Sequence, residues 1–128
     1  MSWELKMHYP DQSMADHLDK WNYPNEEWTT ECLRANAFVC RIDKDHEVVG
    51  YVWFNHFPDS YRVFELHICI AQEHLRRWFS RKILESFYRI VRLLDGRHIL
   101  LAHQNPKITE RLKKHGWTVC HPLAFRSV

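Results

Sequence analysis

The spacing of apolar residues changes once within residues 64–94, and this change restricts the fold more than any other feature of the sequence. Residues Phe64–Ile70 alternate strictly, so that Glu65, His67 and Cys69 share one face and four apolar side chains share the other. A period of two predicts a strand. Further on, spacings of three and four predict one buried helical face, formed by Phe79, Ile83, Phe87, Ile90, Val91 and Leu94. We therefore expect a central strand at 63–71 and a helix at about 75–95.

The segment Leu75–Ser80 joins this strand to this helix as a loop and carries Arg76 and Arg77. Free backbone amides and the helix dipole favour an anion at such a helix start. At the other end, Gly96 is expected to stop the helix by adopting the left-handed conformation, which costs glycine no steric energy.

Together, this strand, loop and helix resemble the central motif of the GNAT (GCN5-related N-acetyltransferase) superfamily, a strand that ends in an Arg-Gly-x-Gly-x-Gly/Ala loop. The resemblance covers roughly residues 36–117. In that family the loop amides hold the pyrophosphate of acetyl-CoA, and the strand parts from its neighbour to admit the pantetheine arm. Here the loop Arg falls on Leu75 and the glycines fall on Arg76, Trp78 and Ser80. The run Arg77-Trp-Phe-Ser-Arg81 most resembles small GNAT-like proteins of tailed bacteriophages, some of them internal virion proteins.

The resemblance implies a set of positions for acetyl-CoA, if the protein is active. These cofactor-binding candidates are Ile68, Ile70, Arg76, Arg77, Trp78, Phe79, Ser80 and Asn105. Trp78 places a large ring where the family holds a diphosphate, whereas Arg76 and Arg77 could bind phosphate through charge-assisted hydrogen bonds. We expect weak or absent binding of acetyl-CoA unless the arginines replace the lost amide contacts.

Acetyl transfer also needs a base for the amine and an acid for the leaving thiolate. Glu65 and His67 share a strand face and are the candidate base, acting directly or through water; a purely structural histidine is the alternative. For the acid, the family commonly uses a Tyr in the last helix, within Asn-x-x-Ala-x-x-x-Tyr-x-x-x-Gly-Phe. The run Asn105–Trp117 matches the Asn, the Gly and the aromatic residue, but Leu112 occupies the Tyr position and cannot donate a proton.

The rest of the chain predicts an α/β fold, with a mixed central sheet flanked by helices, within a single domain at 1–128. This order of elements resembles that of the GNAT-like (acyl-CoA N-acyltransferase) fold. Further strands are expected at 3–8, 37–42, 47–54, 98–102 and 117–120, and helices at 11–21, 24–33 and 106–115, the last closed by Gly116. Because few residues follow Gly116, the C-terminal hairpin should be shortened and the last strand should lack its usual partner.

Composition limits the setting of the protein. No run approaches the roughly 20 apolar residues of a membrane span. The four cysteines are scattered, which favours a reducing compartment and hence the cytoplasm of the host cell, with a virion as a further location. The ten histidines lack metal-binding spacing, so no metal is expected.

Charge is distributed unevenly between the two halves of the chain. Residues 1–31 contain seven acidic residues against two lysines, and residues 72–116 contain eleven Lys and Arg against four acidic residues. The basic half suits a phosphate-bearing ligand, nucleic acid or an acidic protein surface. The arginines of the long helix are spread around it, so nucleic acid ranks behind the other two partners.

Two interpretations from different classes remain. The degraded loop, Leu112 and the short tail favour a phage-encoded, non-catalytic structural or virion-assembly protein that contacts other protein subunits through residues 75–81 or 117–128. The alternative is an active acetyl-CoA-dependent N-acetyltransferase whose cationic amine substrate is attracted by the acidic N-terminal segment.

Overall fold

The computed structural model describes residues 3–21, 23, 33, 37–57, 60–74, 80–103 and 105–128. Within them one mixed sheet has the order β1-β2-β3-β4-β5-β7-β6, in which β4 and β5 run parallel and the other neighbours antiparallel. The strands are β1 (Trp3–Met7), β2 (Ala37–Lys44), β3 (Glu47–Phe57), β4 (Ser60–Ile70), β5 (His98–Ala102), β6 (Thr118–Cys120) and β7 (Leu123–Ser127). The helices are α1 (Gln12–Lys20), the 3-10 turn η1 (Gln72–His74), α3 (Arg81–Leu93) and α4 (Pro106–Lys113). The predicted α/β class is confirmed.

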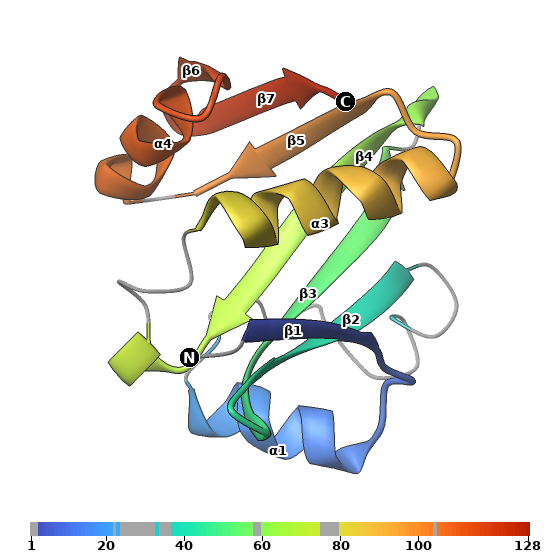
Figure 1. Cartoon of the computed structure of the whole chain (residues 1–128), viewed down its shortest axis with the longest axis vertical. Coiled ribbons are helices and arrows are strands. Elements are labelled where there is room, and N and C mark those ends of the chain that lie inside the picture. Colours follow the sequence, from blue (N-terminus) through green and yellow to red (C-terminus); the bar gives the residue numbers. More distant parts are fainter. Residues whose placement is uncertain are drawn as a thin grey trace.

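Helices cover both faces of the sheet, as the predicted order of helices and strands implied (Figure 1). Phe64 and Leu66 of β4 pack with Phe87 and other buried residues of α3 in the larger hydrophobic cluster. On the opposite face, Cys69 joins a smaller cluster with Met14 of α1 and with buried aromatic residues of β3. The two periods in the sequence therefore identified both the central strand and the helix that crosses it.

The predicted start of the long helix near residue 75 is wrong, because α3 begins at Arg81. Ser80 is extended, with φ −122° and ψ 154°, and its Oγ accepts a hydrogen bond of 3.2 Å from the amide of Ile83. A serine in this role ends the extended chain and caps the first turn. Phe79, which extended the apolar stripe in the sequence, lies outside the described residues, as does the predicted helix 24–33 apart from the helical Leu33.

The prediction for Gly96 is also wrong, since Asp95 rather than Gly96 is left-handed, with φ 63°. Gly96 is needed for another reason. A Cβ atom there would lie 2.5 Å from Cγ1 of Val91 and 2.7 Å from Cδ2 of Phe64. The glycine thus permits the end of α3 to approach β4 closely. By contrast, Gly116 has φ 86° after α4, so the predicted closure of the last helix is confirmed.

The C-terminal segment forms a short but complete hairpin, which corrects the expectation that the last strand lacks a partner. β6 pairs with β7, and β7 inserts between β6 and β5. A turn of two residues, His121 and Pro122, joins the strands. Because so short a turn needs little chain, the residues after Gly116 supply both strands. The edge on this side of the sheet is therefore β6.

Candidate functional site

The candidate site lies where β4 and β5 separate. The two strands are paired at Val63↔His98, Phe64↔Ile99 and Glu65↔Leu100, and nowhere further among the described residues. β4 nevertheless continues to Ile70 and β5 to Ala102, so the strands diverge after Glu65 (Figure 1). From Leu66 onward, the β5-facing backbone groups of β4 lack a strand partner within the part of the chain that the structure describes. Such groups require hydrogen-bonding partners of another kind. Ile68 and Ile70, two of the candidates for cofactor binding, lie on this diverging part of β4.

Glu65 and His67 meet at the point of divergence. They lie on one face of β4, and Nε2 of His67 is 3.2 Å from Oε1 of Glu65. The side chains are partly buried, with 34% of Glu65 and 21% of His67 exposed. The imidazole of His67 stacks on the indole of Trp53, with ring centroids 5.6 Å apart and an angle of 15°. The structure therefore brings together the two residues predicted as the base and holds the imidazole in one orientation.

The protonation state of His67 follows from these surroundings. Burial lowers the pKa of His67 below 6.5, and the Glu65 carboxylate opposes that shift. The imidazole is consequently neutral at pH 7 and able to accept a proton. Once protonated, it would be stabilised by the carboxylate beside it. A neutral imidazole next to a carboxylate has the properties required of a general base near neutral pH.

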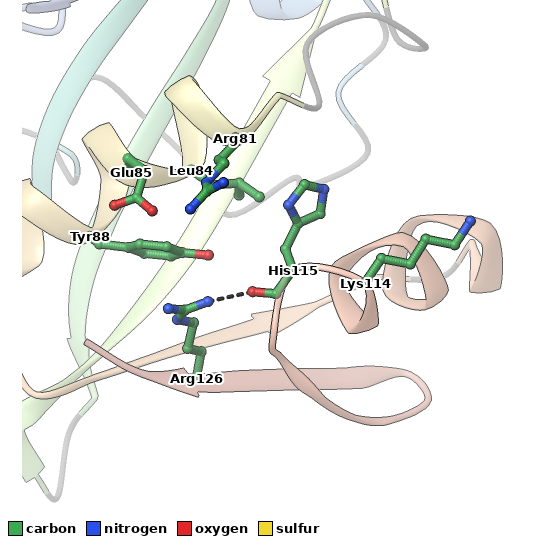
Figure 2. A pocket seen from close by; sticks show the side chains of 7 residues that line it. All are labelled: Arg81, Leu84, Glu85, Tyr88, Lys114, His115 and Arg126. Atoms are coloured by element: carbon green, nitrogen blue, oxygen red, sulfur yellow. Dashed lines mark hydrogen bonds between the residues drawn. The ribbon is translucent and has the colours of Figure 1, made fainter.

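The start of α3 offers a second polar feature. The Oγ of Ser80 accepts a hydrogen bond from the amide of Ile83, and the carbonyl of Ser80 accepts one from the amide of Leu84. The amides of Arg81 and Lys82, at the positive end of the helix, have no acceptor within the described chain. A cavity of about 400 Å³ lies beside this first turn and is lined by Arg81, Leu84, Glu85, Tyr88, Lys114, His115 and Arg126 (Figure 2).

Most of the polar lining of this cavity is basic, and one of its cations is fixed in place. The guanidinium of Arg126 lies 4.4 Å from the centre of the Tyr88 ring and donates a hydrogen bond to the carbonyl of His115 (Figure 2). Arg81 and Lys114 are exposed. Sequence analysis did not identify Tyr88 or Arg126 as part of a site, because their contact joins a helix to a distant strand and has no local sequence signal.

The structure places the other residues that were considered for the site in several different environments. Asn105 caps α4, since its Oδ1 accepts a hydrogen bond of 3.0 Å from the amide of Lys107. Leu112, at the position of the family's tyrosine, is 1% exposed and belongs to the main hydrophobic cluster. His115 lines the basic cavity. The remaining cofactor candidates lie outside the described residues: Arg76, Arg77, Trp78 and Phe79.

Two absences apply to the described part of the chain. Its His, Cys, Asp and Glu side chains form no group of three or more that could hold a metal ion. Its helices include none with the length and apolar character needed to cross a membrane.

Neither a protein-family model nor a curated protein sequence matches the chain. Solved structures do resemble it. An acetyltransferase of the GNAT family from Streptococcus pneumoniae has a TM-score of 0.71 at 12% identity over 99% of each chain. Mutant forms of the spermidine/spermine N-acetyltransferase SpeG from Vibrio cholerae give 0.73 at 14% identity, over 98% of this chain and 95% of that one. The Salmonella typhimurium protein yncA, solved with its cofactor acetyl-CoA, gives 0.68 at 14% identity, over 100% and 94%. The chain therefore has the GNAT fold.

Proposed function

We propose that the protein is an acetyl-CoA-dependent N-acetyltransferase that acts on a primary amine. The observation that carries this proposal is the placement of the Glu65–His67 pair at the point where β4 leaves β5. A neutral imidazole supported by a carboxylate is a suitable base for an amine nucleophile. The diverging strands next to it provide unpaired backbone groups for an acyl donor.

The described residues fit acetyl-CoA in two places. The pantetheine arm contains amide groups, which would pair with the unpaired edge of β4 between Leu66 and Ile70. The phosphates would bind at the start of α3, where the amides of Arg81 and Lys82 lie at the positive end of the helix dipole and the basic cavity adjoins the first turn. Positively charged side chains would therefore take over part of the role that glycine amides have in the family's loop.

The chemistry divides between the ligand and the chain. When bound, acetyl-CoA supplies a thioester whose carbonyl carbon accepts the amine nitrogen, with release of the thiol. His67 takes the proton that the amine loses, and Glu65 stabilises the imidazolium so formed. General base catalysis of this kind contributes about 10²- to 10⁴-fold to a rate.

Leu112 removes the family's acid, and this loss need not abolish transfer. A thiol has an ordinary pKa near 8.5, so a thiolate departs with far less need of a proton than an alkoxide. We expect a slower enzyme for this reason. Leu112 is also the observation that favours the second candidate, a non-catalytic component of an assembly. The structures from Streptococcus pneumoniae and Vibrio cholerae named above are acetyltransferases, which favours the enzyme.

Titration calorimetry of the full chain with acetyl-CoA, followed by assays of acetyl transfer to an amine panel, tests the proposal. We expect a Kd near or below about 10 μM, which corresponds to about −7 kcal/mol. Glu65→Gln and His67→Gln should each lower kcat by about 100-fold or more and leave the Kd of acetyl-CoA unchanged. His98→Gln, which alters an exposed histidine on the neighbouring strand, serves as the matched control. Absence of acetyl-CoA binding would leave the assembly component as the better candidate.

A further inference from the structure

The register of the sheet places residues of three other strands level with Glu65. Asn55 of β3 is opposite Glu65, Glu65 is opposite Leu100 of β5, and Leu100 is opposite Phe125 of β7. Two residues further along β5, and therefore on the same face, Ala102 is opposite Leu123. Because paired residues point to the same face, the candidate base shares its face with the side chains of β5 and β7.

This part of the face is apolar and uncovered by any described helix. α1 packs on β2, β3 and β4, whereas α3 and α4 contribute to the cluster on the opposite face. Phe125 is 46% exposed and Leu123 is 41% exposed. Together with Leu100 and Ala102 they form an apolar strip beside Glu65, here called the β5–β7 strip.

At the end of the strip nearest Glu65, the polar groups could bind a single cationic group. Glu65 provides the one carboxylate on this face among the described residues of β4, β5, β6 and β7. Next to it, Oδ1 of Asn55 is buried and has no hydrogen-bond donor in the described structure. A carboxylate and an amide oxygen are both acceptors, so the N–H groups of one amine would satisfy both. A polyamine would need further carboxylates along its length, and the strip instead provides hydrocarbon and an aromatic ring.

We propose that the β5–β7 strip binds the apolar body of a monoamine and so selects arylalkyl or alkyl monoamines over polyamines. This inference rests on the proposed acetyltransferase function, because it assigns the acceptor of that same site. The amine nitrogen lies at Glu65 and Asn55, and the apolar body lies along Leu100, Leu123 and Phe125. Burial of apolar surface against the exposed Phe125 ring supplies the preference.

The test compares 2-phenylethylamine with spermidine, using the full-length protein and saturating acetyl-CoA. We expect kcat/KM for 2-phenylethylamine to exceed that for spermidine by about tenfold or more. Phe125→Ser should remove this preference mainly through KM, while ethylamine, which lacks a long apolar body, should be affected little. Leu93→Ser is the matched control, since Leu93 is a 79% exposed leucine on α3.

Ligand-observed NMR provides a second readout that does not need turnover. Saturation transfer to the ring protons of 2-phenylethylamine should appear with wild type and be lost with Phe125→Ser but not with Leu93→Ser. If this signal occurs while no amine is acetylated, the acceptor site stands and the proposed function fails. Preference for spermidine, or equal behaviour of Phe125→Ser and wild type, overturns the inference. A wild-type dimer in sedimentation that Phe125→Ser converts to a monomer also overturns it, because a second copy would then cover the strip.

Discussion

The indole nitrogen of Trp117 donates a hydrogen bond of 2.7 Å to the hydroxyl of Tyr88, and both side chains are buried. This bond connects α3 to the residue that precedes β6. The guanidinium of Arg126, from β7, lies over the same tyrosine ring. The long helix and the C-terminal hairpin are thus joined at one aromatic residue, and the cavity beside the start of α3 depends on that junction.

Tyr88→Phe should lower the free energy of unfolding by about 1–3 kcal/mol, because it leaves the buried N–H of Trp117 without an acceptor. Urea unfolding followed by circular dichroism measures the change. A double-mutant cycle with Trp117→Phe isolates the hydrogen bond, since the two substitutions should be less destabilising together than their sum. Strict additivity would show that the bond contributes no stability.

Gly96→Ala should destabilise the protein by about 1–3 kcal/mol, because its Cβ would overlap Val91 and Phe64. Asp95→Gly is the matched comparison. Asp95 has φ 63°, so glycine at this position relieves the steric strain of a left-handed side chain. This gain offsets the larger conformational entropy that glycine loses on folding, and stability should change by less than about 1 kcal/mol. Thermal unfolding of the two variants ranks them, and the opposite order would contradict the packing role of Gly96.

These two positions show what the sequence could and could not predict about the fold. The period of two in β4 and the helical stripe of α3 are imposed by burial, which marks every second or every third to fourth residue, so both elements were predicted. The left-handed residue depends on a local choice between Asp95 and Gly96 that packing against Phe64 decides. Packing partners distant in the sequence leave no period, and the sequence therefore pointed to the wrong residue.

The candidate site likewise has one part that the sequence could predict and one part that it could not. Glu65 and His67 were predicted because both lie on one face of one strand, and their proximity requires only the strand itself. The strip formed with Leu100 and Phe125 was not predicted, because it requires the order of four strands. A protein partner at residues 117–128 was predicted in part because the last strand was expected to lack a neighbour. The completed hairpin removes that reason, and the partner itself stays a prediction.

The cysteines should differ sharply in reactivity. Cys40 and Cys69 are buried, and burial raises the pKa of each thiol to about 12, whereas Cys120 is exposed. Since the thiolate is the reactive form, a maleimide should label only Cys120 in a folded Cys32→Ser background. Mass spectrometry counts the labels. Adding Cys120→Ser should abolish labelling, and urea should then expose both remaining thiols; rapid native labelling of Cys69 would contradict its burial.

Stability and activity should both decline as the pH falls below about 6.5, the ordinary pKa of histidine. Burial lowers the pKa of His67 in the folded state, so the unfolded chain binds a proton at a higher pH than the folded chain does. The stabilising contribution of neutral His67 is therefore complete above pH 6.5 and is lost as the pH falls toward its lowered pKa, with a slope of at most about 1.4 kcal/mol per pH unit for one proton. Burial also lowers the pKa values of His17 and His103 in the same direction.

Urea unfolding at pH 7.5 and pH 5.5 measures this loss for wild type and for His67→Gln. The variant should lose less stability between the two pH values, because its side chain does not titrate. If His67 is the base, kcat should fall over the same acidic range in wild type, since protonation removes its free nitrogen lone pair. His98→Gln should retain the wild-type pH dependence of both quantities. An identical pH dependence of stability in wild type and His67→Gln would show that His67 keeps its ordinary pKa, and the argument for a neutral base held beside Glu65 would then fail.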